Sequence, residues 1–208
     1  MALTKRQIVT ALSVVYLSAL TALAAYALRA SHIYSLPIPD ILCALTVALP
    51  ALAGMSFETL LSLHNRLVAK GAVATSRPFQ LILGGFIIYE TVLATLAGTH
   101  ISPAGSLNCA LREKWDGLFQ AKDGDGVKAI QDAFQCCGFA STRDMAFPFF
   151  DAQHGHDACM VRYERTGSCL EPWRNEEVKV AVMLLLVPLL VFVWKVRWVI
   201  RPCLRSRC

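Results

Sequence analysis

The apolar residues of this chain fall into four long, nearly continuous blocks separated by polar segments. The blocks contain 21, 23, 20 and 23 residues and cover positions 8–28, 41–63, 79–98 and 178–200. About 20 consecutive apolar residues are enough for a helix to cross the roughly 30 Å hydrocarbon layer of a bilayer. The pattern therefore predicts four transmembrane helices, and the first block is too long to be the core of a cleavable secretion signal.

The overall composition points in the same direction. Hydrophobic residues occupy 55% of the 208 positions and charged residues only 17%, whereas a soluble domain typically has about 45–50% and about 25%. A soluble core of this size could not bury the excess. The composition thus excludes a soluble enzyme, a disordered chain and a nucleic-acid-binding module, and we expect no nucleic-acid partner.

Basic residues indicate which side of the membrane each polar segment occupies. Segments 1–7 and 64–78, together with the stretch from Lys195 to the end of the chain, contain ten basic residues and no acidic one. Cytoplasmic loops are enriched in Lys and Arg, so we expect both termini, including the 201–208 tail, in the cytoplasm of a plasma-membrane protein. The segments left on the outer side are a short loop, 29–40, and a long one, 99–177.

Glu90 lies near the middle of the third apolar block. An ionised carboxylate at this depth costs a few kcal/mol or more, so its side chain should point into the bundle, accept hydrogen bonds or carry a proton. Proton or cation transport would require a second ionisable group at the same depth. Glu58 and Lys195 both lie toward the ends of their blocks, so the sequence offers no such partner and favours a packing role for Glu90.

Small residues recur at helical spacing in the first two blocks, as Ala11, Ser18, Ala22 and Ala25 and as Ala44, Ala48, Ala51 and Met55. Stripes of this kind let two helix backbones approach closely in lipid. We expect the two stripes to face each other; the alternative is that alanine is simply common in these blocks.

The long outer segment contains five of the eight cysteines, and its eight basic and twelve acidic residues leave it net negative. Disulfides persist outside the cell, and a domain of 79 residues needs such bridges because its core is small. Helical periodicity is visible over residues 107–119 and again over 127–134. Cys136-Cys137-Gly138 follows, and no clear period is visible from there to Cys169.

Four apolar blocks, a short first outer loop, and a long second one with Cys136-Cys137-Gly138 and two further cysteines resemble the tetraspanin family over the whole chain. The resemblance implies an all-α membrane protein. Its expected architecture is a four-transmembrane-helix bundle with a small, disulfide-pinned, mainly helical extracellular domain between the third and fourth helices. It implies a membrane organiser that recruits other integral membrane proteins, itself among them, into microdomains. Membrane lipid, sterol included, is a further implied partner.

The resemblance also implies two disulfides, Cys136 with Cys169 and Cys137 with Cys159. Adjacent cysteines cannot easily bond to each other, so each requires a different partner. The family often has Pro-x-Ser-Cys at the third cysteine, where this chain reads His-Asp-Ala-Cys, and this departure leaves an exchange of the two downstream partners open. Cys109 remains as a free thiol or an intermolecular bridge.

Three aromatic rings, those of Phe147, Phe149 and Phe150, lie within four residues of the irregular stretch. They either cap the core of the small domain or form an exposed apolar patch for a partner protein or the membrane surface. In the family that the chain resembles, the region between the triplet and the last cysteine binds partners. The three rings are therefore candidate partner-binding residues.

Cys203 and Cys208 follow the last apolar block in a basic tail. That setting suits palmitoylation, and two unmodified thiols are the alternative. We expect no prenylation, which requires a cysteine at the fourth position from the end. Cys203 is the sixth residue from the end of the given sequence and Cys208 is the last.

The sequence contains no motif that predicts catalysis or cofactor binding. His154 and His156 precede Cys159, but a metal site would need the thiolate that a disulfide consumes. We therefore expect no enzyme activity, no cofactor and no metal. A proton-coupled transporter or channel subunit using Glu90 is the alternative function, whereas a claudin-like junction protein would have its long loop first.

Overall fold

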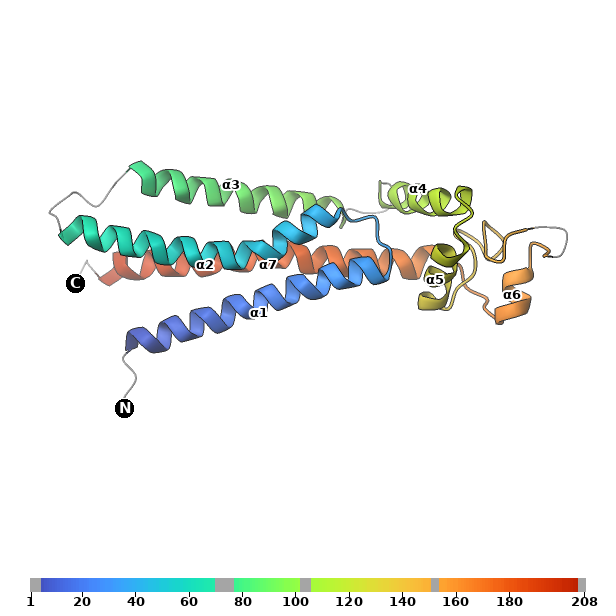
Figure 1. Ribbon diagram of the computed structural model, residues 1–208, viewed down its shortest axis with the longest axis horizontal. Helices are drawn as coiled ribbons and strands as arrows, with labels where there is room; N and C mark the ends of the chain where they lie inside the picture. The colour runs from blue at the N-terminus through green and yellow to red at the C-terminus, as the bar shows by residue number, and fades with distance from the viewer. Residues whose placement is uncertain (1–4, 70–76, 102–105, 151–153, 206–208) are drawn as a thin grey trace. The chain divides into compact units, whose positions relative to one another are not determined.

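The computed structural model describes residues 5–69, 77–101, 106–150 and 154–205, and every regular element in these ranges is an α-helix (Figure 1). In chain order the helices are α1 (Lys5–Ile33), α2 (Asp40–Ala69), α3 (Arg77–Thr99), α4 (Ser106–Gln120), α5 (Gly124–Phe134), α6 (Ala158–Tyr163) and α7 (Leu170–Arg205). The four long helices contain the four apolar blocks and extend beyond them. The two helical patterns of the outer segment correspond to α4 and α5.

The chain forms two compact units. The first consists of Met1–Leu28, Asp40–Gly98 and Met183–Cys208, and the second of Arg29–Pro39 and Thr99–Val182. Both α1 and α7 contribute to each unit, because they continue past the ends of the apolar blocks.

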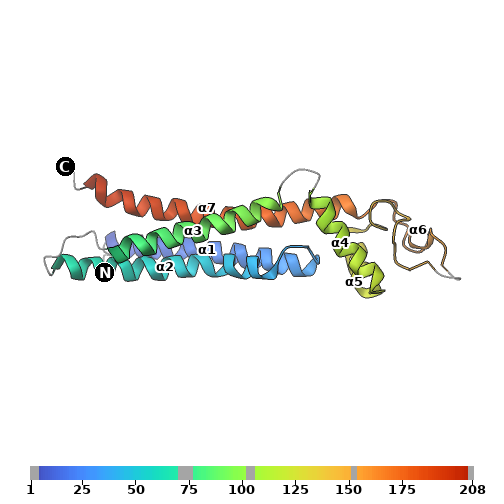
Figure 2. The same ribbon diagram turned by 90° about the horizontal axis from the view of Figure 1, so that it is seen from above.

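In the first unit, long helices run beside one another (Figures 1 and 2). Three helices of the described chain are long and apolar enough to cross a membrane, and the qualifying stretches are Gln7–Ile33 of α1, Asp40–Leu60 of α2 and Leu170–Arg197 of α7. Large apolar side chains such as Val15, Leu52 and Ile88 are exposed on this unit while others fill its interior. A helix that is apolar all round needs an apolar surrounding. The protein is therefore a helical membrane protein.

Two tyrosine hydroxyls form hydrogen bonds to backbone carbonyls of a neighbouring helix in this unit. The Tyr16 hydroxyl of α1 donates to the carbonyl of Leu190 on α7 at 3.1 Å, and the Tyr89 hydroxyl of α3 donates to the carbonyl of Leu45 on α2 at 2.8 Å. A polar group without water gains from any partner it can reach. These two bonds link α1 to α7 and α3 to α2.

The expectation that the two small-residue stripes face each other is wrong. Ala11, Ser18, Ala22 and Ala25 are exposed, and so are Ala44, Ala51 and Met55 of the second stripe. α1 instead buries a different set of small residues at helical spacing, Ala24, Ala27 and Ala30. The sequence of α1 thus contains two possible packing faces, and composition alone does not distinguish them.

The second unit has its own core, built from α4, α5 and the beginning of α7. Leu111, Trp115, Val127, Ile130 and Trp173 are all at most 1% exposed. Trp115 packs edge-on against Trp173, with ring centroids 5.8 Å apart. Such aromatic pairs add to the stabilisation from buried area, which matters in a domain with so few large apolar residues.

The link between α1 and α2 belongs to this second unit. Leu36 and Ile38 in the link are buried, with exposed fractions of 5% and 4%. The indole Nε1 of Trp173 donates to the carbonyl of Tyr34 at 2.8 Å, and the Tyr34 ring lies 5.3 Å from that of Phe134. The link between α1 and α2 is therefore a structural part of the second unit.

Candidate functional site

Two disulfides hold the irregular stretch of the second unit. Cys136 bonds to Cys169 with their Cα atoms 5.1 Å apart, and Cys137 bonds to Cys159 with theirs 5.9 Å apart. These are the two pairs that the family resemblance implied, so the open exchange of partners does not occur in the structure. α5 ends at Phe134, and the left-handed conformation of Gln135 (φ 50°) turns the chain so that the adjacent cysteines follow directly.

Gly138 has a conformation and a setting that only glycine fits. Its φ is +64°, and a Cβ at this position would lie 2.2 Å from the carbonyl oxygen of Ser141 and 2.6 Å from that of Asp144. Its own carbonyl accepts the amide of Cys169 at 3.0 Å, while the amide of Cys137 donates to Gly167 at 2.9 Å. The third residue of the triplet thus lets two backbone segments pair beside the disulfides.

Gln131 is a connecting residue that sequence reasoning missed. It lies on α5 and is 1% exposed. With its amide oriented to satisfy both partners, its nitrogen donates to the carbonyl of Phe147 at 3.1 Å and its oxygen accepts from the amide of Gly138 at 3.0 Å. A polar residue among the apolar positions of an amphipathic helix was the available signal, since such a residue must find partners once buried.

The three aromatic candidates separate into two groups. The Phe149 ring packs edge-on against Phe119 of α4 at 5.2 Å and against Phe147 at 5.6 Å, and both Phe147 and Phe149 are partly buried. Phe150 is 62% exposed and stacks on the His156 ring at 4.3 Å. Phe147 and Phe149 therefore cap the core, and Phe150 has the exposure that a partner contact needs.

A second large apolar side chain is exposed on α6. Val161 is 78% exposed, although Cys159, the second residue of α6, is buried and held by a disulfide. Arg165 follows this helix and donates to the Gln131 carbonyl and to the Asp132 carboxylate, both at 2.8 Å. Phe150 and Val161 are thus carried by a stretch whose base is fixed covalently and by hydrogen bonds.

Glu90 has an ionisable partner, and the expectation that none lies at its depth is wrong. The Nζ atom of Lys195 on α7 lies 2.7 Å from a carboxylate oxygen of Glu90 on α3, and the two residues are 8% and 4% exposed. The ammonium also lies 5.2 Å from the centre of the Phe86 ring. Lysine carries its charge on a long flexible chain, so its position along the helix did not fix the depth of that charge.

His100 and Glu177 form a further pair that sequence reasoning missed. His100 Nδ1 lies 2.9 Å from Oε1 of Glu177, which is fully buried. The pair joins the residue that follows α3 to α7. Both residues lie next to block boundaries, where polar residues are ordinary, so the sequence carried no signal for it.

Cys109, Cys203 and Cys208 do not belong to the two disulfides. Cys109 is exposed on α4, and its redox state stays a prediction. The side chain of Cys203 and the whole of Cys208 lie outside the described residues. Among the residues that the structure describes, no three His, Cys, Asp or Glu side chains form a group that could hold a metal ion.

Comparison with known proteins found no match: no family model, curated protein or solved structure matches this chain. Support for a function therefore comes from the disulfides, the exposed apolar side chains and the buried polar pairs described above.

Proposed function

We propose that this protein is a tetraspanin-like membrane organiser without catalytic activity. In this proposal α1, α2, α3 and α7 form a four-helix transmembrane bundle and both termini lie in the cytoplasm. The second unit then lies outside the cell, is called the outer unit from here on, and recruits other membrane proteins at the plasma membrane. The observation that carries the proposal is the covalent arrangement at Cys136 and Cys137. Each is bonded to a different downstream cysteine, and the enclosed stretch presents exposed apolar side chains.

The outer unit combines a fixed base with exposed apolar side chains, and this combination suits selective recognition of a partner. The disulfides, the Gly138 backbone pairing and the Gln131 amide fix the base of the stretch, while Phe150 and Val161 project outward. A pre-ordered surface loses less conformational entropy on binding than a mobile one. Sequence changes in the exposed part could alter the partner without disturbing the frame.

Two apolar side chains are enough for recruitment within a membrane. Burying one Phe or Val side chain contributes about 1.5–3 kcal/mol, which gives weak binding between molecules free in solution. Two proteins held in the same bilayer meet at a high effective concentration, so weak contacts suffice. An interaction surface of this size is therefore sufficient to recruit partner proteins laterally within the membrane.

The proposal is tested by crosslinking and mass spectrometry in intact membranes. Changing both Phe150 and Val161 to Ser should remove the crosslinked partners from the 139–168 stretch while delivery to the cell surface stays normal. Ala129, exposed on α5, provides the control, because Ala129→Ser should keep every partner. Retention of all partners by the double variant, or reduced and unpaired cysteines at 136 and 137 in the surface protein, would refute the proposal.

The pair formed by Glu90 and Lys195 favours a second candidate function, a proton-coupled transporter or channel subunit. Ionisable groups inside a membrane commonly mark ion or proton pathways, and the pair supplies the second group that transport needs. Flux through liposomes that contain the purified protein decides between the two functions. Transport predicts that Glu90→Gln abolishes flux while assembly persists; absence of flux in the unchanged protein would exclude it.

A further inference from the structure

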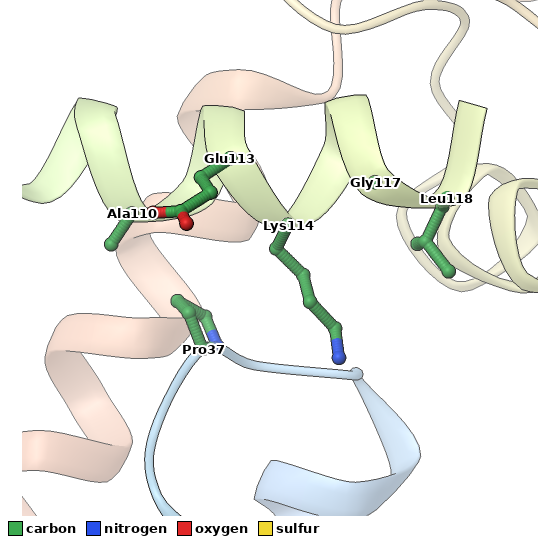
Figure 3. A pocket seen from close by; sticks show the side chains of 6 residues that line it. All are labelled: Pro37, Ala110, Glu113, Lys114, Gly117 and Leu118. Atoms are coloured by element: carbon green, nitrogen blue, oxygen red, sulfur yellow. The ribbon is translucent and has the colours of Figure 1, made fainter. Parts of the chain in front are cut away.

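The second unit contains a groove between the α1–α2 link and α4. It has a volume of about 430 Å³ and is lined by Pro37, Ala110, Glu113, Lys114, Gly117 and Leu118. Figure 3 shows α4 along one side and the link with Pro37 opposite, with the side chain of Lys114 extending from α4 toward the link. The groove thus has apolar walls and two opposite charges on successive residues.

Chain connectivity brings this groove close to the membrane surface. Pro37 lies in the short link between Ile33, which ends α1, and Asp40, which begins α2. Both helices are apolar enough to span a bilayer. Pro37 lies three positions before Asp40, so their Cα atoms are at most about 11 Å apart. The groove therefore lies within reach of lipid headgroups.

The charges favour one class of headgroup. Glu113 and Lys114 are exposed, and neither takes part in the ion pairs of the described residues. The surrounding segment, residues 99–177, has twelve acidic and eight basic residues, so its excess of negative charge opposes a purely anionic lipid. A headgroup that carries both a phosphate and an ammonium complements an adjacent Lys and Glu.

We propose that this groove binds the zwitterionic headgroup of a membrane phospholipid. The phosphate accepts hydrogen bonds from Nζ of Lys114, the ammonium lies at the carboxylate of Glu113, and the glycerol region contacts Pro37 and Leu118. Bound lipid then links the second unit to the membrane. Neither Phe150 nor Val161 is among the residues that line the groove.

Gly117 provides a way to fill the groove without disturbing its walls. It lies on α4, lines the groove, and a Cβ placed on it meets no heavy atom within 4 Å. Gly117→Leu therefore adds a side chain in open space. Gly155 is equally open but lies outside α4, so Gly155→Leu is the matched control.

The test uses the full chain in nanodiscs of phosphatidylcholine that include a phosphatidylcholine with a photoreactive group in its headgroup. Crosslinks should map to residues 106–120. They should decrease about tenfold in Lys114→Gln, as expected for loss of a charge-assisted hydrogen bond, and should also decrease in Gly117→Leu, because the added side chain fills the groove. Gly155→Leu and Lys128→Gln, a change at an exposed lysine of α5, should leave them unchanged. Intact disulfides, measured by mass spectrometry, verify that each variant is folded.

Three results would overturn the proposal. Equal labelling of α4 in all variants would mean that the groove does not hold the headgroup. Equal labelling by a photoreactive phosphatidylglycerol would exclude a requirement for the ammonium. Binding of soluble glycerophosphocholine without any lipid crosslink would show that the ligand is a free zwitterion instead of a membrane lipid.

Discussion

Glu90 on α3 and Lys195 on α7 form a buried ion pair, with Nζ of the lysine 2.7 Å from a carboxylate oxygen. Neither side chain has a further hydrogen bond within the described residues. Each charge therefore depends on the other for compensation, which couples the positions of α3 and α7 in the first unit.

Removing one member of this pair should cost far more stability than removing both. Glu90→Leu or Lys195→Met alone leaves an uncompensated buried charge, which costs about 3–5 kcal/mol. The double variant replaces the pair with apolar side chains and should recover most of that loss. Unfolding of the purified chain in lipid measures all three variants.

An exposed ion pair serves as the control for this cycle. Arg112 and Asp116 lie 3.7 Å apart on α4, and the arginine side chain is 60% exposed. Arg112→Gln should change the unfolding free energy by less than about 1 kcal/mol. Additive effects of Glu90→Leu and Lys195→Met would mean that the two charges do not stabilise each other.

The two disulfides should contribute unequally to the stability of the outer unit. The bond from Cys136 to Cys169 spans 33 residues and that from Cys137 to Cys159 spans 22. Each should contribute about 2–4 kcal/mol, and the longer loop about 0.4 kcal/mol more, if the bonds act by restricting the unfolded chain. Paired Cys→Ala replacements, compared by thermal unfolding of the full chain, give the two values; a larger loss from the shorter loop would contradict this account.

Gly138 should tolerate no side chain. Gly138→Ala forces a Cβ into two carbonyl oxygens and imposes a positive φ on alanine, so it should destabilise the outer unit by at least about 2 kcal/mol. Gly155→Ala places its Cβ in open space and should have little effect. Proteolysis of the 139–168 stretch, followed over time, distinguishes the two variants, and equal cleavage rates would contradict the structure.

The sequence predicts elements in this protein better than it predicts their contacts. Apolar block length identifies the long helices, and periodicity identifies α4 and α5, because both signals are local. The pairing of Glu90 with Lys195 depends on how far a lysine side chain extends between two helices. The face that α1 buries depends on which of its two small-residue stripes meets a neighbouring helix. Both relationships depend on a second helix, so the sequence of one helix alone does not determine them.

The outer unit shows the same distinction at the level of single residues. Cys136-Cys137-Gly138 identified the frame through a family resemblance, and its bonding agrees with the structure. The sequence could not divide Phe147 and Phe149 from Phe150, since all three are equally apolar. Only the packing of Phe149 on Phe119 and of Phe147 on Phe149 separates them from Phe150. The hydrogen bond that ties the α1–α2 link to Trp173 had no sequence signal, because its acceptor is the backbone carbonyl of Tyr34.

That hydrogen bond gives the last prediction. Trp173→Phe keeps a ring in the core but removes the 2.8 Å bond from Nε1 to the carbonyl of Tyr34. Loss of this bond should accelerate amide hydrogen exchange in the link, residues 34–38, by about tenfold, as expected for one lost buried hydrogen bond. Trp115→Phe is the matched control, because its indole donates to Met145 at 3.3 Å and its loss should accelerate exchange near residue 145 instead. Identical exchange maps for the two variants would mean that Trp173 does not hold the link in the outer unit.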